Sequence, residues 1–354
     1  MRLMMTAAVL LVLLASTAGA LADDTRAVTA TTAAAAPSHA VGLSATGFLL
    51  PFTEGAIEVL VNQGVVQPGF TPVAGSSGGS IFAAALCAQG GRETAPLHAA
   101  LERFAEGCRR AAACAFTQDR AVRALMADIL DSGVASGDDD EAVAQRCAGR
   151  AFAAISRFGG GGGGSKPSSS SLLTALLPAR SARALRAAWR SWWRPEAWLV
   201  GEDWQSRDDL VDGVAASCFF PLLSSALRPW ASFRGVGRLA DGVFAAPLPL
   251  PPSENRLRPL RVSAVPLGTS AAPMLSPPIL EAEIAPFLRI GAEQGLAELE
   301  AAGLPSAARW GRYLLLVPDA RQRAAMRELG RREAMAWWRE VEQGSGLSIG
   351  VAAS

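Results

Sequence analysis

The strongest constraint in this 354-residue sequence is the run Gly75-Ser76-Ser77-Gly78-Gly79, which directly follows the apolar residues 70–74. A serine between glycines after an apolar run is typical of a nucleophile elbow, a sharp turn from strand to helix that exposes the serine hydroxyl. Glycines on both sides let the backbone turn without side-chain clashes. The run therefore predicts a strand before Ser77 and a buried helix over 80–89, although Gly-Ser clusters also form ordinary turns.

The amino terminus has the pattern of a secretory signal. Residues 1–22 contain Arg2, an apolar run over 7–15 that is too short to span a bilayer, and small residues before Asp23. We expect cleavage after Ala22 and a secreted or luminal protein. Residues 23–40 are rich in Ala, Thr and Ser, which predicts a low-complexity leader. It would be a linker or a second targeting element for an organelle reached through the secretory route.

The amino-acid composition argues against several kinds of binding partner. Half of the residues are apolar, which is ample for a core, and 33 basic against 32 acidic residues give no global field for nucleic acid. The five cysteines allow up to two disulfides of undetermined pairing with one thiol left over, and their spacing matches no zinc site. The acidic run 138–141 is read as a solvated turn rather than a metal loop, and we expect no metal or cofactor.

Residues 42–49, followed by a helical pattern over 52–62, indicate a strand, a small-residue loop and a helix. Backbone amides at such a loop, together with a helix N-terminus, form a natural site for negative charge. An ordinary tight turn is the alternative reading.

The run 43–60, taken with Ser77, resembles the oxyanion segment and nucleophile of patatin-like phospholipases, closest to the branch that contains animal triglyceride lipases. The resemblance implies a three-layer α/β/α sandwich with a mostly parallel central sheet. Alternation of apolar strand candidates with helices also favours an α/β fold. The resemblance further implies an oxyanion hole, the group of amides that binds the developing negative charge, at Ala45, Thr46, Gly47 and Gly78. Ala45 and Leu50 stand where the family usually has glycine.

Residues 238–243 resemble the Asp-Gly motif of the same family, with Val243 in place of a common second glycine. A helix start at Ser206 and a small-residue segment ending at Pro221 precede it, as in the family. The resemblance makes Asp241 the general base for Ser77. A Ser-His-Asp triad in hydrolase order is improbable because no histidine follows His98, and the other histidine, His39, falls in the predicted leader.

The hydrophobic pattern of the rest of the chain, taken with the resemblance, predicts a domain over 41–304 and a helical extension over 305–354. Helical periodicity covers 93–131, with expected core positions at Leu97, Leu101, Phe104, Val122 and Leu125. We expect a strand over 152–158 with a hairpin partner over 197–204, a strand over 260–265, and helices over 288–303 and 319–343.

An insertion over 159–195 separates the two hairpin strands. It begins with six glycines, which predict a flexible surface loop. A helix over 178–193 would place basic residues on one face and tryptophans opposite, as in helices that lie at a lipid surface. The candidate membrane contacts, on a bilayer or a lipid droplet, are Arg183, Arg186, Trp189, Arg190 and Trp192. Packing of the tryptophans on the domain is the equal alternative.

These features predict a serine carboxylic ester hydrolase that cleaves glycerolipid esters, phospholipid or acylglycerol, through a Ser77–Asp241 dyad and an acyl-enzyme. The departures at Ala45, Leu50 and Val243 leave a second hypothesis, a lipid-binding member of the family with weak or no catalysis. A third hypothesis is a transacylase, in which an alcohol other than water takes the acyl group.

Overall fold

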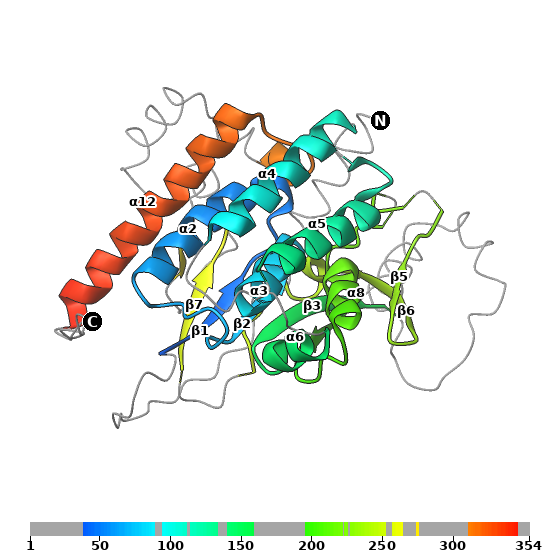
Figure 1. Cartoon of the computed structure of the whole chain (residues 1–354), viewed down its shortest axis with the longest axis horizontal. Coiled ribbons are helices and arrows are strands. Elements are labelled where there is room, and N and C mark those ends of the chain that lie inside the picture. Colours follow the sequence, from blue (N-terminus) through cyan, green and yellow to red (C-terminus); the bar gives the residue numbers. More distant parts are fainter. Residues whose placement is uncertain are drawn as a thin grey trace, which may run out of the picture.

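The computed structural model describes residues 38–88, 94–111, 114–133, 140–158, 195–221, 223–225, 227–252, 257–264, 274–275 and 311–345 (Figure 1). The expected signal 1–22, nearly all of the leader, the lipid-contact helix 178–193 and the helix 288–303 lie outside these residues. In the described ranges, no helix combines the length and the hydropathy needed to cross a membrane.

A mixed sheet lies at the centre of the molecule. Its eight strands in the described part of the chain are β1 His39–Leu43, β2 Val73–Ser76, β3 Ala151–Arg157, β4 Glu196–Val200, β5 Ala231–Phe233, β6 Val236–Asp241, β7 Arg258–Val262 and β8 Met274–Leu275. Their order is β5-β6-β3-β2-β1-β7-β8, and β4 also pairs with β3. With helices packed against this sheet, the fold is α/β and compatible with an α/β/α sandwich (Figure 1).

The expectation of a mostly parallel sheet is wrong. Strand β1 is parallel to β2 and β7, and β2 is parallel to β3, but β4 and β6 are antiparallel to β3. Strand β5 is antiparallel to β6 because the two residues that join them, Arg234 and Gly235, both have positive φ, 46° and 74°. Two consecutive residues with positive φ make the tight hairpin turn that reverses the chain. The predicted hairpin partner of β3 is confirmed, although β4 ends at Val200.

The helices of the described ranges are α2 Leu50–Asn62, α3 Gly78–Ala88, α4 Ala95–Arg110, α5 Gln118–Gly133, α6 Asp140–Cys147, α8 Arg207–Ser217 and α12 Ala320–Ser345, with short 3₁₀ helices η1 Gly47–Leu49, η4 Gly242–Phe244 and η5 Gly311–Leu314. Every residue of α3 is buried, as its apolar sequence predicts. Four of the five core positions predicted on α4 and α5 are buried, and Phe104 is half-buried.

The periodic segment 93–131 forms two helices rather than a continuous one. Between α4 and α5, Cys114 and Phe116 have left-handed φ values of 54° and 65°, which an α-helix does not accommodate. The start of β1 is a second correction, because His39 and Ala40 belong to this strand and not to the low-complexity leader.

Helix α12 packs directly against α2, so the carboxyl-terminal segment is part of the same core (Figure 1). Gly55 on α2 and Gly330 on α12 lie against the backbone of the opposite helix, where any side chain would collide. Arg327 on α12 pairs with the buried Glu54 at 3.1 Å, and burial raises the pKa of Glu54 above its ordinary value. Glycine contacts and a buried ion pair therefore fix the two helices together.

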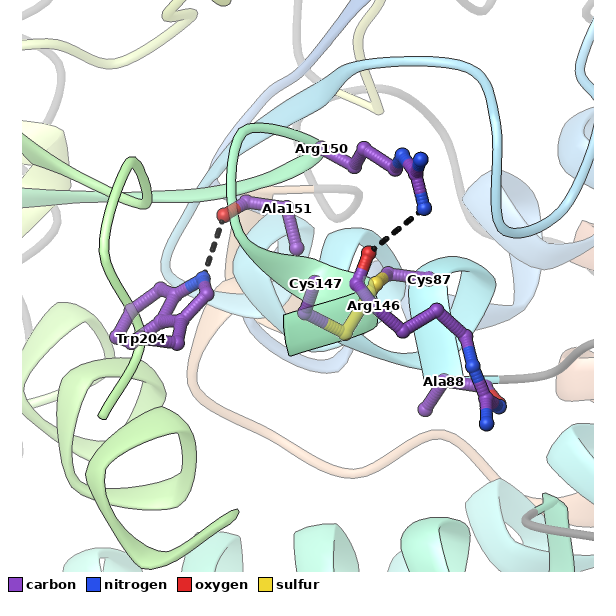
Figure 2. Close-up of a disulfide and its surroundings, with 7 residues drawn as sticks. All are labelled: Cys87, Ala88, Arg146, Cys147, Arg150, Ala151 and Trp204. Atoms are coloured by element: carbon purple, nitrogen blue, oxygen red, sulfur yellow. Dashed lines mark hydrogen bonds between the residues drawn. A yellow bond between two sulfur atoms is a disulfide. The ribbon is translucent and has the colours of Figure 1, made fainter. Parts of the chain in front are cut away.

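Two disulfides join helices and loops. Cys87 at the end of α3 is bonded to Cys147 at the end of α6 (Figure 2), and Cys108 is bonded to Cys114 across the turn between α4 and α5. Cys218 is a free, buried thiol. The sequence left this pairing open, and the three-dimensional contacts decide it.

Candidate active site

Ser77 occupies a sharp turn between β2 and α3. Strand β2 ends at Ser76, α3 begins at Gly78, and Ser77 has a left-handed φ of 52°. Such a φ is strained for a residue with a side chain, and strain of this kind gathers at functional sites. A side chain on Gly75 would collide with the backbone of Gly79, so the turn needs glycine at 75. The predicted nucleophile elbow is therefore present in geometry.

Side-chain hydroxyls hold the backbone of this turn on both sides. The Ser77 N–H donates to Ser217 Oγ at 3.0 Å, and Ser217 Oγ donates to the Ala154 carbonyl of β3 at 2.6 Å. The Ser77 carbonyl accepts a hydrogen bond from Ser80 Oγ, also at 2.6 Å. Because both backbone groups of Ser77 are occupied, the position of its side chain is set by the sheet and by α8.

Asp241, the last residue of β6, lies opposite Ile155 of β3. Its N–H donates to the Phe219 carbonyl at 2.7 Å, and its carbonyl accepts from Ser156 Oγ at 2.7 Å. Its carboxylate accepts a hydrogen bond from the Val243 N–H at 2.9 Å, and its interaction with the Ser77 hydroxyl favours its charged form. The structure therefore places the two predicted catalytic residues next to each other.

Burial governs the charge of this carboxylate. Asp241 is only 3% exposed, and burial raises its pKa to about 7 despite the opposing effect of the hydrogen bonds from Ser77 and Val243. A carboxylate in a poorly hydrated position binds a proton more tightly than one in water. Asp241 is thus poised to exchange a proton near neutral pH.

The loop after β1 lies against the elbow. A side chain on Gly78 would collide with Thr46 Oγ1, and one on Gly79 would come within 2.6 Å of the Leu43 carbonyl at the end of β1. In the residues that the structure describes, the N–H groups of Thr46, Gly47 and Gly78 have no hydrogen-bond acceptor. Three of the four residues predicted for the oxyanion hole therefore have unoccupied amides, in the elbow or in the loop that lies against it.

Ala45 is the exception among those four residues. Its N–H donates to the Pro247 carbonyl at 3.1 Å, so it is already occupied. Ala45 shapes the loop through this bond and does not supply a free donor.

Sequence reasoning did not assign roles to Ser217 and Cys218, although both lie in the small-residue segment before Pro221. Cys218 is buried, and its Sγ lies 3.8 Å from Ser80 Oγ. Burial, and to a smaller degree the charge of Asp241, raises the pKa of this thiol, so it stays protonated beside the dyad. No sequence signal indicated these roles, which depend on α8 ending at Ser217, where the Ser217 hydroxyl meets the Ser77 N–H.

Neither histidine reaches Ser77. His98 on α4 contacts Glu54 on α2 at 2.8 Å. His39 begins β1, whereas the elbow lies beyond the carboxyl ends of the parallel strands, and burial lowers the pKa of His39 to about 4. This placement leaves Asp241 as the proton acceptor in contact with Ser77.

Other predicted sites fall partly outside the described ranges. The proposed lipid-contact residues of helix 178–193 are not described. Asp140 and Glu141 form the first turn of α6, while positions 138 and 139 are likewise not described. Among the described residues, no group of three His, Cys, Asp or Glu side chains is arranged to hold a metal ion.

A scan against models of known protein families and a search of curated proteins give no match for this chain.

Gly78 gives a direct test of this geometry. We expect Gly78→Ala to destabilise the protein by about 1 to 3 kcal/mol, because the new methyl group overpacks against Thr46 Oγ1. Gly107→Ala is the matched control, since a methyl group at this position of α4 meets no other atom within 4 Å. Urea denaturation measures both variants. Equal midpoints would show that the loop and the elbow are not in contact.

The raised pKa of Asp241 predicts a pH-dependent stability. The folded protein holds this proton more tightly than the unfolded chain does, so ionisation of Asp241 lowers the free energy of unfolding. This loss of stability begins near pH 4 and is complete above about pH 7. We expect Asp241→Asn to raise the free energy of unfolding relative to wild type at pH 8, on the order of a few kcal/mol. The difference should shrink as the pH falls to 4. A gap that does not change between pH 4 and pH 8 would contradict a buried, strongly shifted carboxylate.

Proposed function

We propose that this chain is a serine lipid acyl hydrolase that cleaves glycerolipid esters through Ser77, Asp241 and an acyl-enzyme. The observation that carries the proposal is the placement of the Ser77 hydroxyl, on a left-handed elbow, beside the buried Asp241 carboxylate. The resemblance of residues 43–60 and 238–243 to patatin-like phospholipases supports the lipid class of substrate.

In this mechanism, Ser77 Oγ attacks the ester carbonyl carbon while Asp241 takes its proton. The amides of Thr46, Gly47 and Gly78 bind the oxyanion, and loss of one such donor typically removes about 3 to 4 kcal/mol of transition-state stabilisation. The proton passes from Asp241 to the leaving alcohol as the ester bond breaks. Asp241 then accepts a proton from the water that hydrolyses the acyl-Ser77 ester.

The pKa of Asp241, about 7, suits this role. A general base works best when its pKa lies near the operating pH, because it is then both ionised and a good proton acceptor. An ordinary aspartate, with a pKa near 4, would be a much weaker base for a serine hydroxyl.

An aromatic cluster next to Asp241 supports an apolar acyl group. Phe244 follows Asp241 closely in the chain, and its ring lies 5.2 Å from that of Phe220 and 6.2 Å from that of Phe158. Trp230 lies 5.0 Å from Phe158. All four side chains are half-buried, so apolar surface is present on the Asp241 side of the site.

Two disulfides support the proposal that the protein works in the secretory pathway, since disulfides persist in oxidising compartments. The signal-like residues 1–22 point to the same compartment.

The occupied Ala45 amide and the departure at Val243 favour one alternative, a lipid-binding protein with little catalysis. A transacylase would use the same acyl-enzyme but pass the acyl group to a second alcohol.

The proposal predicts that the mature chain hydrolyses phospholipid or triacylglycerol emulsions and a soluble short-chain ester. Ser77→Ala should lower turnover by at least about a thousandfold. Ser76→Ala is the matched control, since the buried Ser76 hydroxyl has no hydrogen-bond partner in the described part of the chain. Turnover should also fall as the pH drops through about 7, where Asp241 becomes protonated.

Three results would decide between the alternatives. No turnover by the folded chain, with lipid co-purifying, would replace hydrolysis by lipid binding. Acylated product formed from added lysolipid or diacylglycerol would assign acyl transfer. Equal loss of activity in the Ser76 and Ser77 variants would remove Ser77 as the nucleophile.

A further inference from the structure

Three large apolar side chains in the described part of the chain are exposed: Phe70 by 62%, Phe116 by 55% and Leu227 by 93%. Single exposed apolar residues are common and need no explanation. Two of these three, however, lie on loops that are bonded to each other.

Hydrogen bonds join the loop of Phe116 to the loop of Leu227. The Phe116 N–H donates to the Leu223 carbonyl at 2.7 Å. Asp119 continues the contact through an ion pair with Arg228 at 2.8 Å. We call this surface, formed by residues 114–117, 223–225 and 227–228, the loop rim.

The loop rim lies at the active-site end of the sheet. On one side, Phe48, in the short helix η1 between β1 and α2, packs with Cys108 and Cys114. The disulfide between these two cysteines closes the base of the Phe116 loop. On the other side, the segment that leads to Leu223 begins at Phe219, whose carbonyl accepts the Asp241 N–H. The rim therefore connects the two segments that flank the Ser77–Asp241 pair.

Phe116 combines a strained backbone conformation with an exposed side chain. Its φ of 65° is uncommon for a residue with a large side chain, yet the side chain remains more than half exposed. Burial of the Phe116 side chain within the protein therefore does not compensate for this strain. Insertion of the side chain into an apolar surface outside the protein would compensate for it.

The charged residues near the loop rim favour binding to an anionic surface. Arg109, Arg110 and Arg228 have exposed side chains, and Arg120 is exposed on the first turns of α5. Glu106 and Asp119 are the acidic residues that pair with three of these four cations. Apolar side chains surrounded by excess arginine are typical of surfaces that enter the boundary of an anionic lipid layer.

We propose that the loop rim is a lipid-docking surface: Phe116 and Leu227 insert into an anionic lipid layer and bring the end of the sheet that carries Ser77 and Asp241 against it. This inference rests on the proposed function, because it assumes that the substrate lies in such a layer. It is separate from the lipid contact expected for helix 178–193.

Vesicle binding of the inactive Ser77→Ala chain tests the docking, because this variant does not consume the lipid. Flotation with phosphatidylcholine vesicles containing phosphatidylserine would measure the partition coefficient. Adding Phe116→Ala and Leu227→Ala should weaken partitioning by at least about tenfold, since two apolar side chains no longer insert.

Phe70→Ala, in the same Ser77→Ala background, is the matched control. Phe70 precedes β2 and lies under Arg150, which precedes β3, so it marks the opposite end of the sheet. We expect its removal to leave partitioning unchanged. Equal loss in the control and in the double variant, or no loss in the double variant, would overturn the proposal.

Two further readings separate this proposal from its neighbours. When Ser77 is kept, the chain with Phe116→Ala and Leu227→Ala should hydrolyse a soluble ester at the wild-type rate. Loss of catalysis and loss of lipid docking are therefore distinguishable. If sedimentation shows that the double variant converts a dimer to a monomer and vesicle binding is unchanged, the rim is a self-association surface and lipid docking is wrong.

Discussion

The pairing of a serine hydroxyl with a buried carboxylate is the interaction on which this site depends. Ser77 and Asp241 come from distant parts of the chain, and β3 connects them. It pairs with β2 on one side and with β6 on the other, and its Ala154 carbonyl anchors the Ser217 hydroxyl that holds the Ser77 backbone. A carboxylate in such a place resists ionisation, because few water molecules reach it. The same burial that makes ionised Asp241 unfavourable for folding lets its carboxyl group exchange a proton near neutral pH, as the proposed base must do.

The loop between β1 and α2, which carries the proposed oxyanion amides, is supported from outside the sheet. Helix α2 begins at Leu50, directly after the loop, and α12 fixes α2 through close backbone contact and the Glu54–Arg327 pair. The Leu314 carbonyl of η5 also lies against Gly47. The carboxyl-terminal segment, which the sequence indicated only as a helical extension, therefore supports the loop that carries the Thr46 and Gly47 amides. This arrangement couples the stability of a distant helix to the geometry of the site.

Local features of the fold were predictable from the sequence, while features that depend on distant contacts were not. The glycines at 75 and 79 predicted the elbow because only glycine tolerates that close approach, and Ser206 caps α8 as expected. The position of Asp241 came from a family resemblance, since spacing alone does not show that two side chains meet. The antiparallel β5–β6 hairpin was missed because the reversal at Arg234 and Gly235 lacks the usual Asn-Gly signal. Ser217 and Cys218 could not be assigned, because their roles exist only once α8 ends beside the elbow.

The rate at which a fluorophosphonate labels Ser77 tests the proposed Ser77–Asp241 pair, because the probe reports activation of the serine without assuming a substrate. We expect labelling of the folded wild-type chain at Ser77, and labelling at least about a hundredfold slower in Asp241→Asn, since the proton acceptor is lost. Labelling at the wild-type rate in Asp241→Asn would rule out this pair, because Ser77 would then be activated by a group other than the Asp241 carboxylate.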